Sequence, residues 1–193
     1  MPPAAAAGAA GGEANVDWND ADLADDKLAA TLRVVRHQGQ TSEYEHGRIG
    51  ANFRMSAIQA VALRAKLPHL AAWNEGRRRN AAHYNALLAD SGITIPVEAP
   101  YARHVYHVYG VRVPNRDAVQ EALQAREIQT NIHYPIPVHM QKAYQEFGYG
   151  EGDLPVTEKA AKELLSLPMF PELELSQVEE VCAAIRQEVA RAG

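Results

Sequence analysis

The sequence predicts an α+β fold in which helices pack on a small, mainly antiparallel sheet. In the first half of the chain, apolar residues recur at the three- and four-residue spacing of amphipathic helices. From Ile93 onward the pattern changes, and short segments rich in β-branched and aromatic residues lie between further helical segments. The predicted order is helix, helix, strand, strand, helix, strand, extended loop, helix, strand, helix, without an internal repeat.

Composition excludes several classes of protein. The chain has 193 residues, 47% of them hydrophobic, and a net charge of −5, which argues against a general nucleic-acid binder. Its one cysteine, Cys182, excludes an internal disulfide and is predicted to be buried. No apolar run reaches the roughly 18 residues that a membrane span needs. Residues 1–20 form an Ala/Gly-rich tail that is a poor signal peptide and is predicted to be disordered, so we expect a cytoplasmic protein.

The first predicted helix covers Ala21–His37. Its apolar stripe has helical spacing, acidic residues lie near its start, and basic residues lie near its end, as the helix dipole prefers. Gly39 ends this helix. A loop is predicted over Gln40–Phe53.

Two further helices are predicted over Ser56–Leu67 and His69–Asp90, broken at Pro68 and closed by Gly92. The cationic cluster Arg77–Arg79 on the second of them has two interpretations, a nucleic-acid patch or a solvated helix face. Nothing basic surrounds the cluster, which favours the solvated face.

The next segments are predicted as strands over Ile93–Val97, Val105–Val113 and Ile128–Tyr134, with a helix capped by Asn115 that runs through Gln124. His104 and His107 are three residues apart. On a strand such residues point to opposite faces and cannot close on one ion without a bulge, so we predict no metal site.

Two prolines hold the segment His133–Gln141 extended, which makes it a stiff connector that presents two imidazoles and a phenol. A surface turn before a helix over Gln141–Phe147 is the alternative interpretation. A final amphipathic helix is predicted over Ser176–Ala190.

The stretch Tyr44–Val61 suggests a binding site. Glycines 47 and 50 brace a loop, and Ser56 caps the helix that follows. Asn52 and Arg54 lie just before this helix, and residues two apart in an extended loop point the same way. A neutral amide donor beside a guanidinium suits a phosphate or carboxylate. The alternative is that Asn52 stabilises a turn and Arg54 is solvated.

The run Gly50-x-Asn52-x-Arg54-Met55-x-x-x-Gln59-Ala60 resembles a signature of the DegT/DnrJ/StrS sugar aminotransferases, which are fold type I enzymes that use pyridoxal phosphate (PLP). The resemblance extends over about residues 23–191. It implies the C-terminal small domain of such an enzyme over residues 93–193, preceded over residues 21–92 by a helical segment and linking helix. His104–His107 resembles the opening strand of that domain, and Leu165–Phe170 resembles its closing strand.

The resemblance also implies roles for individual residues. Asn52 would reach the cofactor phosphate of the partner subunit in a dimer, and Arg54 would line the same pocket. Candidates for contacts with a nucleotide-linked sugar are Tyr44, His46, His133, Tyr134 and His139.

No catalytic residue is predicted, because the lysine that forms the Schiff base in this family lies in a motif that this sequence lacks. The lysines present have charge-rich or amphipathic helical surroundings: Lys27, Lys66, Lys142, Lys159 and Lys162. We therefore expect roughly the second half of an aminotransferase, inactive alone.

Two functional classes remain open. The first is part of a transaminase that moves an amino group from an amino acid, commonly glutamate, to a nucleotide-linked keto sugar. It would act as a homodimer or paired with a lysine-bearing half. The second is a non-catalytic domain that binds a sugar nucleotide or pairs with a full-length relative. An adjacent reading frame that encodes the lysine half would favour the first class.

Overall fold

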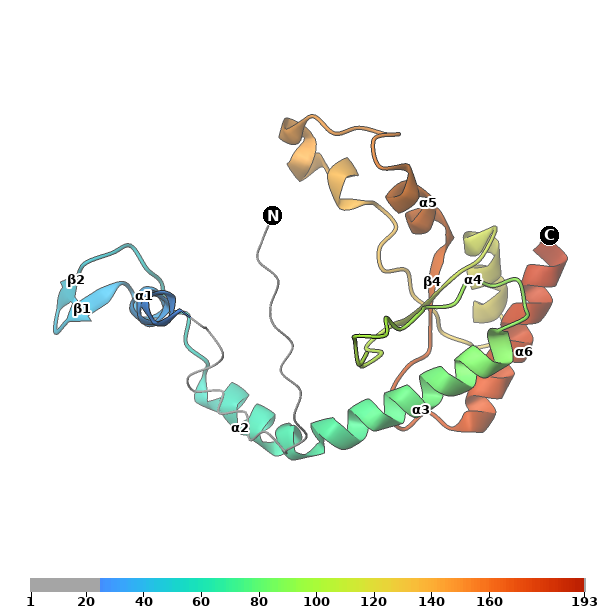
Figure 1. Cartoon of the computed structure of the whole chain (residues 1–193), viewed down its shortest axis with the longest axis horizontal. Coiled ribbons are helices and arrows are strands. Elements are labelled where there is room, and N and C mark those ends of the chain that lie inside the picture. The colour runs from blue at the N-terminus through green and yellow to red at the C-terminus, as the bar shows by residue number, and fades with distance from the viewer. Residues whose placement is uncertain (1–24, 193) are drawn as a thin grey trace. The chain divides into compact units, whose positions relative to one another are not determined.

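The computed structural model describes residues 25–192, which belong to two compact units divided after Arg64. Figure 1 labels the α-helices and most of the strands of both units. The disordered tail predicted over residues 1–20 lies outside the described residues. Within residues 25–192, no helix is long and apolar enough to cross a membrane.

The first unit contains helix α1 (Asp26–Arg36) and a short hairpin of strands β1 (Gln40–Ser42) and β2 (Glu45–His46). The helix begins at Asp26 because the carboxylate of Asp25 accepts hydrogen bonds from the backbone N–H groups of the first turn, at 2.9 and 3.1 Å. The hairpin corrects the prediction of a loop over Gln40–Phe53, since two antiparallel strands pair within the first part of this segment.

Two glycines bring the loop back against the end of α1. Gly39 has a φ of +74°, and a Cβ there would lie 1.8 Å from the carbonyl oxygen of Arg48. A Cβ on Gly50 would lie 2.4 Å from the backbone nitrogen of Gly39. The returning chain is held by backbone hydrogen bonds from Ala51 N–H to the Val35 carbonyl and from Phe53 N–H to the Arg36 carbonyl, at 3.0 and 3.1 Å. The loop is therefore fixed beside α1.

Helix α2 (Ala57–Lys66) follows this loop. Ser56 caps it as predicted: its Oγ accepts from Gln59 N–H at 3.3 Å, and the Gln59 side chain accepts from Ser56 N–H at 2.9 Å. Every residue of α2 is exposed. A 3-10 turn, η1 (Leu67–His69), then interrupts the helix at Pro68, in agreement with the predicted break.

The second unit is built on an antiparallel pair of strands, β3 (Tyr109–Arg112) and β4 (Leu164–Leu167), with Tyr109 opposite Leu167. Single antiparallel bridges extend the sheet on both sides, Thr94 to Arg112 and Asn131 to Ser166. The strands predicted over 93–97 and 128–134 are therefore corrected to one bridge each. The strand predicted over 105–113 is shorter, because its first four residues lie outside the ladder.

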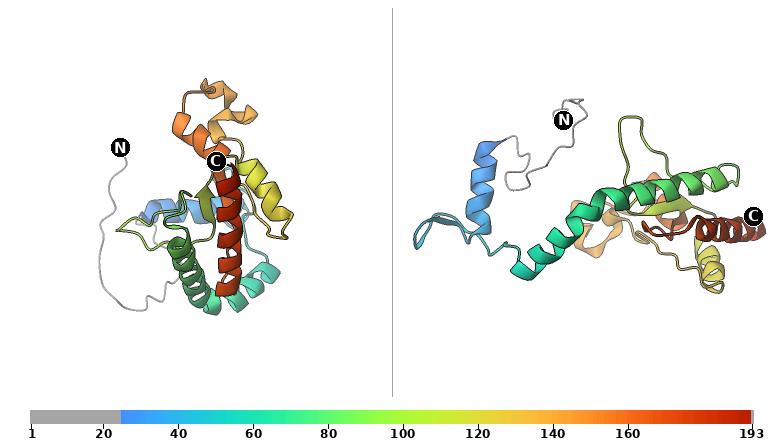
Figure 2. Two further views of the ribbon diagram at one scale, coloured as in Figure 1. Left: turned by 90° about the vertical axis from the view of Figure 1, so that its right-hand side faces the viewer. Right: turned by 90° about the horizontal axis from the view of Figure 1, so that it is seen from below.

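Helices α3 (Leu70–Leu88), α4 (Arg116–Gln124) and α6 (Leu175–Ala192) pack around this sheet. The last helix agrees with the one predicted over 176–190. Helices α3 and α6 run side by side in Figures 1 and 2. Their apolar faces and the sheet form one core, with these side chains fully buried: Tyr84, Leu88, Tyr109, Val111, Leu165, Val178 and Ile185. Cys182 is buried as predicted, and burial raises the pKa of its thiol to about 12.

The part of the chain between α4 and β4 differs most from the prediction. The helix expected over 141–147 is a 3-10 helix, η3 (Lys142–Phe147), preceded by a 3-10 turn, η2 (Val138–Met140). The sequence prediction did not include helix α5 (Pro155–Glu163), although Pro155 stands at its first turn, where proline is favoured.

The arginine cluster on α3 is only partly a solvated face: Arg79 is exposed, whereas Arg77 and Arg78 are half-buried. Arg79 Nη2 donates to the carbonyl oxygens of Pro171 and Leu173, at 3.2 and 3.3 Å, and Arg78 Nη2 donates to the carbonyl of Arg103 at 3.0 Å. These guanidinium groups join α3 to segments far away in the sequence. The predicted solvated face is therefore only partly right, because Arg78 and Arg79 also support the fold.

Candidate functional site

The predicted anion-binding residues meet in the structure. Arg54 Nε donates a hydrogen bond to Asn52 Oδ1 at 2.7 Å, and the backbone of Asn52 bridges to that of His37 at the end of α1. The pair is thus fixed at both ends, by the loop that returns to α1 and by the helix α2 that begins after Ser56. This arrangement orients the guanidinium before any ligand arrives.

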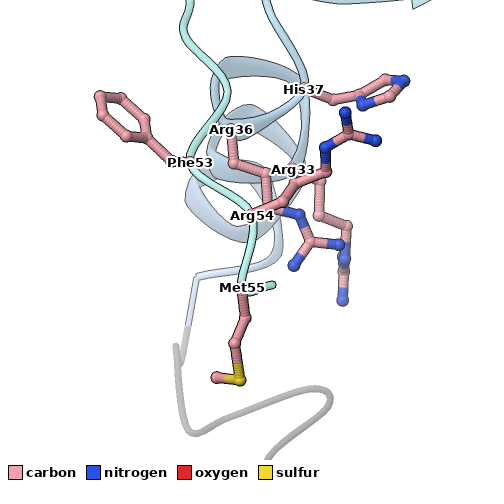
Figure 3. Close-up of a pocket in the computed structure, with 6 residues that line it drawn as sticks. All are labelled: Arg33, Arg36, His37, Phe53, Arg54 and Met55. Atoms are coloured by element: carbon pink, nitrogen blue, oxygen red, sulfur yellow. The ribbon is translucent and has the colours of Figure 1, made fainter. Parts of the chain in front are cut away.

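A hollow of about 370 Å³ opens beside the pair. Its lining consists of Arg33, Arg36, His37, Phe53, Arg54 and Met55. In Figure 3 the guanidinium groups and the imidazole lie on one side of the hollow, whereas Phe53 points away from them. Three of these described lining residues are arginines and none is a carboxylate, so they bring positive charge to the hollow.

The sequence prediction did not include Arg33, Arg36 and His37 as site residues and treated them as cations that favour a helix end. A signal was present, because residues three and four apart on a helix lie on one face. The sequence does not show that these residues line the same hollow as Arg54, because this depends on the return of the loop to α1.

These residues fit the phosphate group of PLP. Guanidinium and amide N–H groups are suitable donors to a phosphate; arginines line the hollow, and the side-chain amide of Asn52 is hydrogen-bonded to one of them, Arg54. This fit concerns only the phosphate group of PLP. The part of PLP that reacts with a lysine is not covered by it, because all five lysines of the chain are exposed.

The predicted sugar contacts of the first unit lie on the β1–β2 hairpin. Tyr44 is 88% exposed at the turn and has a φ of +60°. His46 is also exposed, and its Nδ1 lies 2.9 Å from the carbonyl oxygen of Gln38, which orients the ring. The hairpin therefore presents a phenol and an imidazole to the solvent.

His133 and Tyr134 lie together in the second unit, with their ring centroids 5.4 Å apart. His133 is half-buried, and its Nδ1 lies 2.9 Å from the hydroxyl of Ser166 on β4. Tyr134 is 73% exposed. The sheet edge thus holds the imidazole, and the phenol beside it stays accessible.

His139 differs from the other candidates because its side chain is buried. Its Nε2 lies 3.2 Å from Oε1 of Glu158 on α5. The Glu158 carboxylate also accepts backbone N–H bonds from Gly152 and Leu154. The Gly152 bond is the main cause that lowers the pKa of Glu158, with the His139 and Leu154 bonds adding to it. His139 therefore anchors a segment of the fold, and its predicted contact with a substrate stays a prediction.

The candidates thus form groups in separate units. Asn52 and Arg54 belong to the first unit, as do Tyr44 and His46, whereas His133, Tyr134 and His139 belong to the second. Among residues 25–192, no group of three or more histidine, cysteine or acidic side chains could hold a metal ion.

Comparison with known proteins identifies the family. A profile described as the DegT/DnrJ/EryC1/StrS aminotransferase family matches residues 23–186, which is most of the chain. The chain belongs to this family. The resemblance carried by the Gly50–Ala60 motif is thereby confirmed.

Two curated relatives illustrate the similarity. The chain is 43% identical to the pleiotropic regulatory protein of Geobacillus stearothermophilus, over 84% of this chain and 45% of that protein. It is 42% identical to the dTDP-3-amino-3,4,6-trideoxy-alpha-D-glucose transaminase of Streptomyces venezuelae, over 84% of this chain and 43% of that protein.

Comparison with solved structures also supports the family assignment. The fold is similar to the crystal structure of Streptomyces venezuelae DesV in complex with a ketimine intermediate, with a TM-score of 0.80, 42% identity, and coverage of 84% of this chain and 44% of that one. A family aminotransferase from Brucella abortus gives a TM-score of 0.79 at 36% identity, over 86% of this chain and 44% of that one. The chain thus spans under half the length of the relatives it matches.

Proposed function

We propose that this chain is the C-terminal part of a PLP-dependent aminotransferase that acts on nucleotide-linked keto sugars. Residues 93–193 would form the small domain, and residues 21–92 a helical segment and the linking helix. The observation that carries the proposal is the hydrogen-bonded pair of Asn52 and Arg54 beside an electropositive hollow. The names of the relatives support the substrate class, because several are transaminases of dTDP- or UDP-linked sugars.

In this proposal Asn52 and Arg54 hold the cofactor phosphate across a dimer interface. Bound PLP supplies the electron sink that lets an amino group move from an amino acid to a keto sugar. The exposed Tyr44 and His46 contact the sugar nucleotide from the first unit. His133 and Tyr134 do so from the second, and the Ser166 hydroxyl orients the ring of His133.

A second candidate function is a non-catalytic domain that binds a sugar nucleotide or pairs with a full-length relative. The exposure of Lys27, Lys66, Lys142, Lys159 and Lys162 favours it. A lysine nucleophile is activated by desolvation or by a neighbouring cation, and an exposed ammonium lacks the first of these.

Co-expression with the lysine-bearing part of a family transaminase tests the first function. Asn52→Ala and Arg54→Ala should each weaken PLP retention by about tenfold to a hundredfold, because a hydrogen bond to a charged group is worth roughly 1.5–3 kcal/mol. Arg64→Ala, on the exposed helix α2, is the matched control. If Asn52→Ala and Arg54→Ala both leave amino transfer unchanged, the assignment of these residues to the cofactor site is wrong. An assembled pair that binds sugar nucleotide without any transfer would favour the second function.

A further inference from the structure

The imidazole of His133 is held by a buried serine. Nδ1 of His133 lies 2.9 Å from Oγ of Ser166, a residue of β4 that is 4% exposed. The backbone of Ser166 is itself fixed: Asn131 N–H donates to the Ser166 carbonyl at 3.0 Å, and Ser166 N–H donates to the Asn131 carbonyl at 2.7 Å. Because Asn131 precedes His133 by two residues, this bridge at the edge of the sheet brings the ring and the hydroxyl together.

The burial of Ser166 decides which group donates in this hydrogen bond. A serine hydroxyl can either donate to an imidazole nitrogen or accept from it. Within residues 25–192, Ser166 Oγ has no hydrogen-bond partner other than His133. If Nδ1 donated, the buried hydroxyl hydrogen would have no acceptor, which is costlier than an unused lone pair on the oxygen. The hydroxyl therefore donates to Nδ1, and Nε2 carries the hydrogen of the neutral ring.

Two other histidines have partners that leave no choice of tautomer. Nδ1 of His46 lies 2.9 Å from the carbonyl oxygen of Gln38, which can only accept, so Nδ1 carries the hydrogen. Nδ1 of His104 accepts from Tyr106 N–H at 2.9 Å, so Nε2 carries the hydrogen there. His46 and His133, both predicted to contact the sugar nucleotide, thus present opposite groups at Nε2: a lone pair on His46 and an N–H on His133.

We propose that Ser166 is a positioning residue that holds His133 in the tautomer with its hydrogen on Nε2, so that His133 donates a hydrogen bond to an oxygen of the bound sugar nucleotide. The contact between His133 and this ligand rests on the proposed function. A hydroxyl or carbonyl oxygen of the ligand accepts such a bond, whereas a protonated amino group does not. Through His133, a residue that makes no contact with the ligand thus selects the ligand group that faces the imidazole.

Nitrogen-15 NMR of the full chain, labelled at histidine, reads the tautomers directly. The spectra are recorded at about pH 8, where an ordinary imidazole is neutral. His133→Gln, His46→Gln and His104→Gln assign the three signals by their loss. We expect the hydrogen on Nε2 in His133 and His104 and on Nδ1 in His46. A His133 spectrum with the hydrogen on Nδ1 would overturn the proposal.

Variants of Ser166 test whether its hydroxyl sets this tautomer. In Ser166→Ala, the ring nitrogens of His133 should move towards the averaged frequencies of an imidazole that exchanges between tautomers, with His46 unchanged. Ser166→Thr keeps a hydroxyl and should keep the native spectrum. The control is Ser176→Ala, at an exposed position in the first turn of α6, and far-ultraviolet circular dichroism checks that each variant is folded. An unchanged His133 spectrum in folded Ser166→Ala would show that the hydroxyl does not set the tautomer.

A double-mutant cycle tests the consequence for binding, with UDP-N-acetylglucosamine as the probe and the co-expressed pair as the protein. Ser166→Ala should weaken binding about twofold to tenfold, because a hydrogen bond from His133 is impaired. In the His133→Gln background, Ser166→Ala should have little further effect. Equal losses in both backgrounds would mean that Ser166 does not act through His133. The tautomer is measured on the chain without a ligand, so the proposed function can fail while the role of Ser166 in setting the tautomer stands.

Discussion

His139 and Glu158 form a buried pair, with His139 Nε2 lying 3.2 Å from Glu158 Oε1. The same carboxylate receives the backbone N–H groups of Gly152 and Leu154. One acidic side chain on α5 therefore fixes both ends of the exposed segment between η2 and α5. The ionised carboxylate suits this role because it only accepts hydrogen bonds.

Acid should loosen this segment. The pKa of Glu158 is lowered from its ordinary value of 4.5 by the Gly152 N–H, His139 and the Leu154 N–H. The stability that its ionised form contributes is therefore fully present above pH 4.5 and is lost as the pH falls through the lowered pKa. Thermal unfolding as a function of pH should show Glu158→Gln less stable than the native chain at pH 7, with the gap closing in acid. Glu146→Gln, at an exposed position, is the control. A gap that stays constant with pH would contradict the assignment.

Gly76→Ala should destabilise the second unit. Alanine in a helix interior is normally favoured over glycine by about 1 kcal/mol. At Gly76 on α3, however, a Cβ would lie 2.7 Å from the carbonyl oxygen of Pro171 and 3.1 Å from its Cα. We expect a lower midpoint of thermal unfolding, because α3 and the segment after β4 would have to separate. A higher midpoint would show that the two backbones can move apart without cost. Gly150→Ala is the control, since a Cβ there meets nothing within 4 Å.

Borohydride should fix no PLP on the isolated chain in a one-to-one ratio. Each lysine is exposed and so lacks the desolvation that lowers the pKa of a reactive lysine. Mass spectrometry after reduction would show at most scattered labelling of several lysines. A single stoichiometric adduct on one lysine would overturn this expectation.

The isolated chain should self-associate through the helix that follows the candidate site. Large apolar side chains of the first unit on and just before α2 are more than half exposed: Phe53, Met55, Ile58, Val61 and Leu63. Exposed apolar patches of this kind are typical of interaction surfaces. Sedimentation velocity should therefore show a concentration-dependent increase in mass. Ile58→Glu with Val61→Glu should reduce that increase. Leu28→Glu, on the exposed face of α1, serves as a comparison. A monomer over a wide concentration range would rule this surface out.

Features that depend on neighbours in the sequence were predictable. Ser56 and Gln59 form the predicted cap of α2, and the helix breaks at Pro68. Gly92 has a positive φ, but it does not close α3 as predicted, because that helix ends at Leu88 with Ala89 as its C-cap. The motif from Gly50 to Ala60 is enough to indicate the family, because its residues lie within one short segment. The hydrogen bond between Asn52 and Arg54 joins residues two apart and follows from the same local geometry.

The sequence by itself thus determined the family, most helix boundaries and the local pair of the candidate site, because hydrogen bonds within a few residues set these features. Only the tertiary structure decided how far each strand pairs, because a ladder needs a partner from elsewhere in the chain, and Thr94 and Asn131 find only one bridge each. It likewise placed Arg36 beside Arg54 and His139 beside Glu158. Such contacts require the chain to turn back on itself, and no periodicity in the sequence encodes that return.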